Sequence, residues 1–543
     1  MTHRFDWTTH YPSTRVPVFA RNIVSTSHPL GAQAGLRMIQ QGGNAVDAAI
    51  AAAAVMMLVE PCSNGLGSDA FCILWDGERL HGLNASGPAP AAWTPDYFRR
   101  KHGADARRPP IRGWDSVTVP GAVAGWLALS ERFGKLPFGD LLEPAIDIAE
   151  RGYAVPVVVQ QKWAAATPLL ESLPGWAEAF LPRGRAPEVG EHFSFPAAAR
   201  SLRAIQASRG AALYGGEIAE AAAAHARSHG GAIDVADFAA YRPEWVEPIG
   251  IDVYGHRLHE IPPNGQGIAA LMALGLLEAL PYDDTAPGSA ARMHLEVEAM
   301  RMAFADLHAH VADPAHMRTT PAQLLDRDYL RRRAKGIDPN RAGTHAAGQP
   351  ASGGTVYLCT ADAEGRMVSY IQSNYKGFGS GVVVPGTGIS MHNRGFGFVT
   401  TPGHPNEVAG GKRPLHSIIP AFMTRNGRPS MAFGVMGGNM QAQGHTQMVL
   451  RRVVEGLDPQ ACADAPRWRI DDSGALTVEP GVPSSVVEGL QAMGHQPRVA
   501  PPNNLDFGSA QIAVRLDPDL VGSDDPVYAA GSDHRRDGQA VGR

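Results

Sequence analysis

The sequence predicts a mixed α/β fold, and two kinds of apolar pattern carry that prediction. Helical patterns cover residues 32–41, 45–58 and 289–310. Short runs rich in β-branched and aromatic residues cover 71–75, 355–361 and 366–373, as is typical of strands. The chain has 543 residues, which is too long for one ordinary core, so we expect two lobes or one large layered domain.

Charge and hydropathy exclude several classes of protein. The net charge is −5 and 44% of the residues are hydrophobic, a globular profile without the basic excess of nucleic-acid binders. The longest apolar run, residues 48–59, is shorter than the roughly 20 residues that a membrane span needs. The first twelve residues lack the apolar core of a signal peptide, and the four cysteines form no CxxC pair. We therefore expect a reduced, cytoplasmic protein with no nucleic-acid and no membrane partner.

Two helices are predicted near the N-terminus. The first covers residues 32–41 and is followed by Gly42-Gly43, a typical C-cap signal. Asn44 can cap the second helix, and Asp47 lies in its first turn, where a negative charge is favoured. Residues 45–58 are apolar on every side, so this helix should be buried.

Two patterns resemble a cofactor site and a metal site, but the surrounding sequence argues against both interpretations. Gly65-x-Gly67 is similar to a dinucleotide fingerprint, yet it follows a helix and precedes a strand, which is the reverse of that motif. On the predicted helix 289–310, His294 and Glu298 share a face, but the chain has no HExxH motif. We read these charged residues as a solvated helix face and expect no metal and no cofactor.

The residue composition of the chain changes abruptly at Thr355. Residues 338–354 are small, polar, Gly or Pro, as is typical of a loop. Residues 355–361 and 366–373 read as two strands joined by the turn-forming Asp362-Ala-Glu-Gly365, so the pair predicts a hairpin.

A threonine at this boundary has a specific chemical use. If the chain were cut between Gly354 and Thr355, Thr355 would carry a hydroxyl and a free α-amine. The α-amine has a pKa of about 7.7–8.0, so it can serve as the general base for the hydroxyl near neutral pH. On the pattern alone, the more common interpretation is a threonine that merely begins a strand.

A second glycine-rich segment, residues 433–444, contains Gly437-Gly438. It is no phosphate loop, because no Gly-Lys-Ser/Thr ends it. Consecutive glycines allow backbone N–H groups to approach a site without side-chain obstruction and to stabilise an oxyanion. A plain tight turn is the other interpretation of this segment.

Taken together, these segments resemble the gamma-glutamyltransferase family of N-terminal-nucleophile hydrolases. The resemblance is carried by residues 41–50, 116–126, 355–362, 373–381 and 464–481, and it runs from about Val24 to the C-terminus. It implies an αββα sandwich of two antiparallel sheets and a precursor that cuts itself. Residues 1–354 would form the large subunit and 355–543 the small one, together one layered domain, with a homodimer of such heterodimers as a further expectation.

The resemblance assigns catalytic roles to four residues. Thr355 matches the nucleophile, and Ser373 stands where the family has a second threonine whose hydroxyl contacts the nucleophile's α-amine. Gly437 and Gly438 match the glycines of the oxyanion hole. We therefore expect the catalytic machinery to be intact.

The residues that would bind the substrate differ from the family pattern. Residues 84–90 lack the arginine that clamps the γ-glutamyl carboxylate, and Gly397 replaces the aspartate that pairs with its amine. Tyr375 replaces an asparagine, and His416-Ser417 replace a pair of serines. Leaving both charges of an amino acid unpaired is costly, so glutathione should bind poorly.

We expect instead a small amide with one carboxylate, as in the oxamate amidohydrolase type of this family. The substrate-binding residues would be Tyr375, Asn393, Arg394, His416 and Ser417, with Arg394 and His416 meeting the carboxylate. True gamma-glutamyl transfer and a cephalosporin acylase activity stay open as alternatives. From another class, the chain could be an uncleaved, inactive homologue that only binds ligands.

Overall fold

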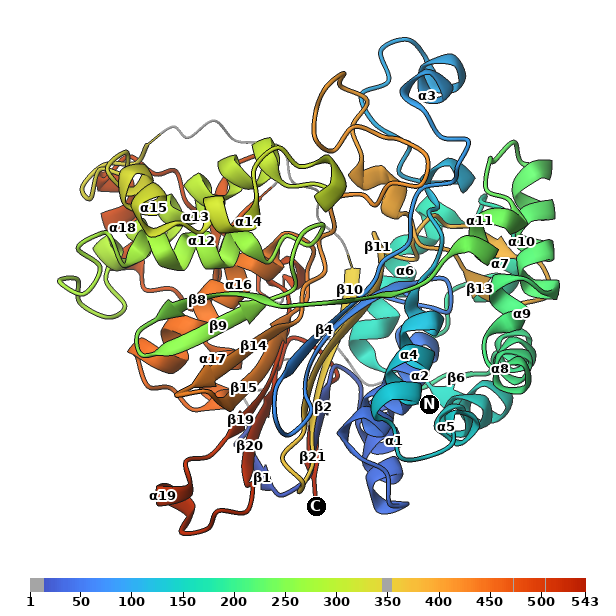
Figure 1. Cartoon of the computed structure of the whole chain (residues 1–543), viewed down its shortest axis with the longest axis horizontal. Coiled ribbons are helices and arrows are strands. Elements are labelled where there is room, and N and C mark those ends of the chain that lie inside the picture. The colour runs from blue at the N-terminus through green and yellow to red at the C-terminus, as the bar shows by residue number, and fades with distance from the viewer. Residues whose placement is uncertain (1–13, 344–353, 472, 503) are drawn as a thin grey trace, which may run out of the picture.

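The computed structural model describes residues 14–343, 354–471, 473–502 and 504–543. Most of the predicted loop at 338–354 lies outside the described residues. In the described part, two seven-stranded antiparallel sheets lie face to face and helices cover both outer sides (Figure 1). The αββα sandwich is therefore confirmed.

The first sheet has the order β1 (Val18–Ala20), β20 (Tyr528–Ser532), β19 (Ala510–Arg515), β15 (Arg428–Val435), β14 (Ala421–Arg425), β9 (His256–Glu260) and β8 (Ile249–Val253). The second has the order β21 (Gln539–Gly542), β2 (Ile23–Thr26), β10 (Gly354–Ala361), β11 (Met367–Tyr375), β3 (Asp69–Trp75), β4 (Leu80–Ala85) and β7 (Glu244–Val246). Both sheets contain strands from before and after Thr355.

Each sheet has its own helix layer (Figure 1). The second sheet is covered by α1 (Pro29–Gln40), α2 (Ala45–Val59), α4 (Ala122–Phe133) and α5 (Phe138–Arg151). The first is covered by α12 (Ile268–Leu277), α13 (Ala290–His310), α15 (Arg327–Ala334), α16 (Met440–Val449), α17 (Pro459–Asp464) and α18 (Ser484–Ala492).

The remaining helices are α3 (Pro95–His102), α6 (Val157–Leu170), α7 (Trp176–Phe180), α8 (Pro196–Ser208), α9 (Ala211–Tyr214), α10 (Glu217–Ser228), α11 (Val235–Ala240), α14 (Pro321–Leu324) and α19 (Pro518–Val521). Short strands β5 (Tyr153–Ala154), β6 (His192–Phe193), β12 (Val383–Val384), β13 (Ile389–Ser390), β16 (Trp468–Ile470), β17 (Leu476–Val478) and β18 (Arg498–Val499) form small sheets at the periphery.

Strand β10 shows why both faces of its sheet are buried. Val356 and Leu358 pack toward α2, whereas Tyr357 and Cys359 pack into the space between the two sheets. Successive strand residues point to opposite faces, so a continuous apolar run is what a strand between two layers needs. The predicted hairpin with β11 is confirmed, and its register runs from Ala361 opposite Met367 to Val356 opposite Gln372.

Helix α2 begins as its sequence predicts. Asn44 accepts hydrogen bonds from the N–H groups of Val46 and Asp47, and the Asp47 side chain accepts one from the N–H of Asn44. This reciprocal capping box satisfies donors that the first turn would otherwise leave unpaired. Every residue of the helix is buried.

Helix α13 differs from its prediction as a solvated face. His294, Glu298 and Asp306 are instead buried, and each has polar partners from distant segments. Asp306, for example, accepts two hydrogen bonds from Arg333 and one from Tyr329 on α15. Burial of charge is tolerated where such partners exist.

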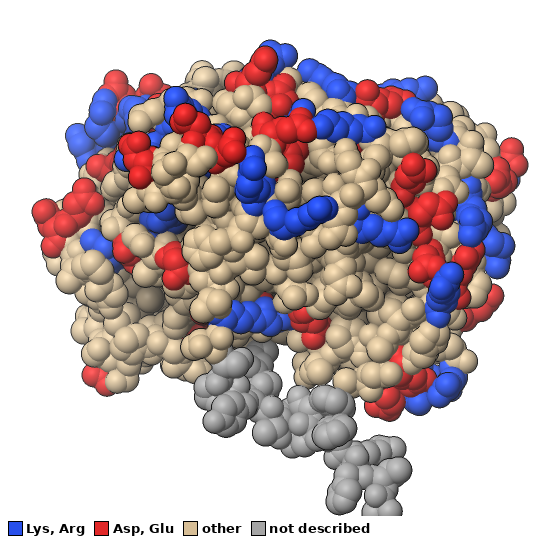
Figure 2. All heavy atoms as spheres, turned by 90° about the horizontal axis from the view of Figure 1, so that it is seen from below, with Lys and Arg blue, Asp and Glu red and all other residues tan. Residues whose placement is uncertain are grey.

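The outer surface carries mixed charge. Figure 2 shows basic and acidic side chains interspersed over the face seen from below. This face therefore offers no large field of one sign to a partner. Among the described residues, no helix is both long enough and apolar enough to span a bilayer.

Candidate active site

Thr355 is the second residue of β10, a strand next to the centre of its sheet. It is 2% exposed. The register between β10 and β11 shifts here, because Gly354 pairs with Tyr375 but Val356 pairs with Gln372. Such a bulge places an extra residue of one strand opposite the other and redirects side chains. The Oγ1 of Thr355 consequently lies 3.4 Å from the Oγ of Ser373, to which it donates.

A residue that the sequence did not single out also holds this hydroxyl. The Nε2 of Gln441, in the first turn of α16, donates to the Oγ1 of Thr355 at 3.2 Å. Its Oε1 accepts from the N–H of Ile419 at 2.9 Å, which fixes the orientation of the amide. Gln441 follows Gly437-Gly438 by three residues, and this proximity to the glycines was the one available signal.

Gly437 and Gly438 form the turn between β15 and α16. Their φ angles are +117° and +63°, a region that glycine adopts without the steric cost of a Cβ. No described residue accepts a hydrogen bond from the N–H of either glycine. Neither N–H therefore has an acceptor in the described part of the chain, and the role of the pair as an oxyanion hole for Thr355 stays a prediction.

A buried carboxylate organises the opposite side of the site. Asp69 accepts hydrogen bonds from the N–H groups of Gly87 and Gly121 and from the Nε2 of His416 at 3.0 Å. His392 lies 3.4 Å away. Burial alone would raise the pKa of Asp69, but His392 and His416 outweigh it and hold that pKa below its usual range. Asp69 is thus ionised.

His416 is held as a neutral imidazole. Burial, followed by the charge of Arg394, lowers its pKa to about 3. Its Nδ1 accepts from the N–H of Ile418 and its Nε2 donates to Asp69, so both ring nitrogens are engaged within the protein.

Arg394 lies beneath Tyr375 and is 1% exposed. Its Nη1 donates to the Oγ of Ser417 at 2.9 Å, and its Cζ lies 4.4 Å from the centre of the Tyr375 ring. Burial lowers its pKa to about 10, against the opposing influence of Asp69. The contact of Arg394 with a substrate carboxylate stays a prediction.

Tyr375 is the last residue of β11, and Asn393 follows β13 and directly precedes the helical turn Arg394–Gly397. Tyr375 has a φ of +77°, which is costly for a non-glycine residue and is often found at functional sites. The Asn393 side chain accepts from the N–H of Lys376 and donates to the carbonyl of Ile111. Asn393 thereby ties together the loops around the site.

A cavity of about 160 Å³ adjoins these residues. It is lined by Tyr375, His416, Ser417 and Gly397 among the positions singled out from the sequence, whereas Arg394 lies behind its wall. Gln266 also lines it and donates to the carbonyls of Ser417 and Gly438, so the cavity wall is joined to the glycine turn. Arg108 and His308 are among the cavity residues that the sequence did not assign to the site.

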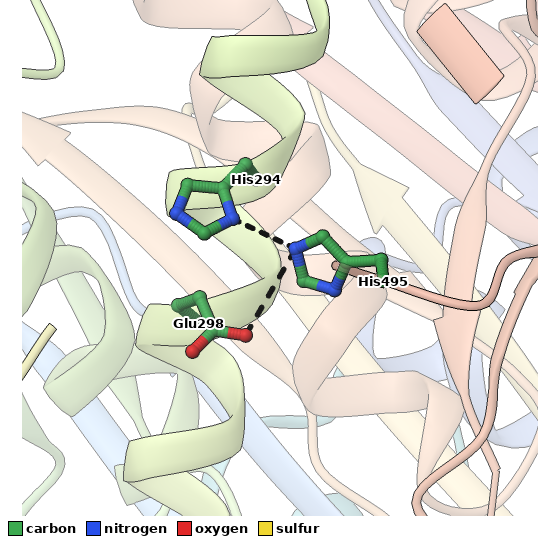
Figure 3. Close-up of side chains that lie close together, drawn as sticks. All are labelled: His294, Glu298 and His495. Carbon is green, nitrogen blue, oxygen red and sulfur yellow. Dashed lines mark hydrogen bonds and ion pairs between the residues drawn. The ribbon is translucent and has the colours of Figure 1, made fainter. Parts of the chain in front are cut away.

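The group His294, Glu298 and His495 lies elsewhere, between α13 and the segment after α18 (Figure 3). The Nδ1 of His294 is 2.7 Å from the Nε2 of His495, and the Nε2 of His294 contacts the carbonyl of Asp338 at 2.8 Å. Glu298 bonds to Arg301 and to the N–H of Gly343. These contacts form a hydrogen-bonded network that anchors residues 338–343.

Comparison with known proteins identifies a family. The family model described as gamma-glutamyltranspeptidase matches residues 31–543. A glutathione hydrolase-like YwrD proenzyme from Bacillus subtilis (strain 168) is 33% identical over 96% of this chain and 98% of its own length. An oxamate amidohydrolase proenzyme from Klebsiella pneumoniae is 34% identical over 92% of this chain and 96% of its own.

Among solved structures, a cephalosporin acylase from Bacillus halodurans is 44% identical and superposes with a TM-score of 0.93, covering 100% of this chain and 99% of its own. The family match, its coverage of the chain and the sandwich architecture all support the same family assignment. The chain belongs to the gamma-glutamyltranspeptidase family of N-terminal-nucleophile hydrolases, which act on amide bonds.

Proposed function

We propose that the chain is a proenzyme that cuts itself between Gly354 and Thr355 and then hydrolyses a small amide that bears one carboxylate. The Thr355 hydroxyl attacks the amide carbonyl carbon and gives its proton to the freed α-amine. The N–H groups of Gly437 and Gly438 bind the oxyanion. The C–N bond then breaks, the amine leaves with the proton, and water hydrolyses the acyl-threonine ester.

The observation that carries this proposal is the composition of the cavity. Its lining includes no Asp and no Glu among the described residues, and Gly397 lies in its wall where the family pattern has aspartate. The ammonium group of a γ-glutamyl substrate would therefore have no anionic partner there, which is costly in a desolvated site. The volume of about 160 Å³ is also below the roughly 300 Å³ at which drug-sized ligand sites begin.

A second candidate activity is removal of an acyl group from a cephalosporin. The similarity to the Bacillus halodurans cephalosporin acylase favours it, since 44% identity extends over the whole chain. A glutathione hydrolase activity has the weaker support, because the cavity lacks an acidic partner for the amine.

Self-cleavage is tested by a denaturing gel and Edman sequencing of the purified protein. Scaling 57.6 kDa by length, we expect bands of about 38 and 20 kDa, the smaller beginning Thr-Val-Tyr-Leu-Cys. An active preparation that consists of one intact band would contradict the proposal, and an inactive intact band would favour the binding homologue.

The substrate is tested with a panel comprising oxamate, a cephalosporin amide and gamma-glutamyl-p-nitroanilide. We expect the highest kcat/KM for the small monocarboxylate amide. A higher value for the gamma-glutamyl substrate than for every monocarboxylate amide would overturn the substrate class, whereas a higher value for the cephalosporin would favour the second candidate.

A further inference from the structure

The cavity lined by Tyr375, His416 and Ser417, which Gln266 joins to the Gly437-Gly438 turn, carries fixed charge of one sign only among the described residues. The lining includes one arginine, Arg108, three histidines, and no carboxylate among the described residues. Burial lowers the pKa of His308 to about 4 and that of His416 to about 3, and it also lowers the pKa of His404. All three rings are therefore neutral near pH 7, and Arg108 is the fixed charge of the cavity.

The guanidinium of Arg108 has hydrogen-bond donors that no described residue occupies. It follows α3 on a loop whose backbone is anchored, since the carbonyl of Arg107 accepts from the N–H of Thr400 at 3.0 Å. The guanidinium lies over the ring of Phe396, with Cζ 5.1 Å from the ring centre. It forms no hydrogen bond and no ion pair with any described residue.

The nearby arginines are used differently. Arg112 donates to the carbonyls of Gly377 and Gly379, and Arg413 pairs with Glu244. Arg394 is buried behind Tyr375 and its Nη1 donates to Ser417, while its Nε and Nη2 have no partner among the described residues. Unlike Arg108, Arg394 does not line the cavity. A planar guanidinium that stacks on an aromatic ring and keeps its donors unoccupied is well suited to bind a carboxylate through two parallel hydrogen bonds.

His308 supplies a second unsatisfied polar atom in the same cavity. Its Nε2 is buried and has no hydrogen-bond partner among the described residues. A buried polar atom without a partner is unfavourable, so a ligand that offers an acceptor would relieve it.

We propose that Arg108 is the residue that binds the carboxylate of the substrate, with His308 as a second contact to the same anion. Arg394 then acts as a positioning residue that holds Ser417 and the Tyr375 ring. This inference rests on the proposed function, because it assigns the specificity of the same site.

The test compares Arg108→Ala and Arg108→Lys with Arg107→Ala, a matched control at the adjacent exposed arginine. Oxamate carries the carboxylate, and oxamide is its neutral counterpart with the same scissile amide. A charge-assisted hydrogen bond contributes enough to change binding about ten- to hundredfold. We expect Arg108→Ala to raise the KM for oxamate by that factor, Arg108→Lys to raise it less, and both to leave kcat/KM for oxamide within about twofold.

Binding is measured separately by titration calorimetry with pyruvate, which keeps the carboxylate and has no amide to cleave. Pyruvate should bind the wild type and Arg107→Ala alike, and about ten- to hundredfold more weakly to Arg108→Ala. A denaturing gel of each variant shows whether its cleavage pattern is unchanged.

The possible failures are distinguishable. Equal losses on oxamate and oxamide, no loss on either, or no binding of pyruvate by the wild type would overturn the assignment of Arg108. Selectivity lost in Arg394→Ala but kept in Arg108→Ala would overturn it in favour of Arg394. Pyruvate binding that depends on Arg108 in a protein that hydrolyses no amide would uphold the anion site and overturn the proposed function instead.

Discussion

The site has two sides that are built differently. One side, here the catalytic edge, comprises the predicted catalytic residues Thr355, Ser373, Gly437 and Gly438 and is fixed by a strand bulge and a glycine turn. The other, here the recognition wall, comprises Tyr375, Arg394, His416 and Ser417 and is held by loops that meet at Asp69. The resemblance read from the sequence implies that the catalytic edge keeps the family pattern apart from Ser373, whereas the recognition wall departs from it. Loops on a rigid scaffold can change specificity without disturbing the chemistry.

The sharpest test of the catalytic edge is Thr355→Ala. Because one hydroxyl would perform both self-cleavage and turnover, we expect a single band on a denaturing gel and a loss of kcat greater than about 10³-fold for every amide. Thr355→Ser keeps a hydroxyl and is the control that should still be cleaved. Activity in Thr355→Ala would place the nucleophile elsewhere.

Asp69→Asn tests whether the recognition wall depends on a buried charge. Removing one partner of a buried charged cluster is expected to cost about 3–5 kcal/mol of unfolding free energy, measured by urea denaturation. Because the folded pKa of Asp69 is below its unfolded value of 3.8, its stabilisation is present above that pH and lost as the pH falls through the folded pKa. Wild-type stability should therefore fall more steeply below pH 4 than that of Asp69→Asn, and parallel curves would contradict the prediction.

Gln441→Met asks whether the catalytic edge extends beyond the family's residues. Losing one hydrogen bond to the nucleophile should lower kcat about tenfold, by a similar factor for charged and neutral amides. Steady-state kinetics on oxamate and oxamide measure this. An effect confined to KM of one substrate would move Gln441 to the recognition wall.

The smallest effect is expected for Ser373→Ala. The Ser373 hydroxyl contacts the Thr355 hydroxyl at 3.4 Å, a long hydrogen bond, so its removal should slow turnover a few-fold and leave measurable activity. A loss as large as that of Thr355→Ala would mean that Ser373 takes part directly in bond breaking.

The sequence predicted those parts of the molecule whose signals are local. The hairpin of β10 and β11 and the capping box of α2 follow from alternating apolar residues and from Asn44 with Asp47. The burial of His294 could not be predicted, because its partner His495 is 201 residues away. Arg108, His308 and Gln441 were missed for the same reason, since separate segments bring them together.

The shared sheets have a consequence for assembly. Strand β2 lies between β10 and β21, and β1 pairs with β20, so each sheet interleaves the two halves that cleavage before Thr355 would create. Neither half could complete a sheet alone, and each would expose unpaired strand edges, which favour aggregation. The intact precursor folds as one molecule, but the cut protein would have to reassemble from two. Cleavage would thus make recovery from denaturation dependent on concentration, and the mature enzyme would owe its persistence to slow unfolding rather than to ready refolding.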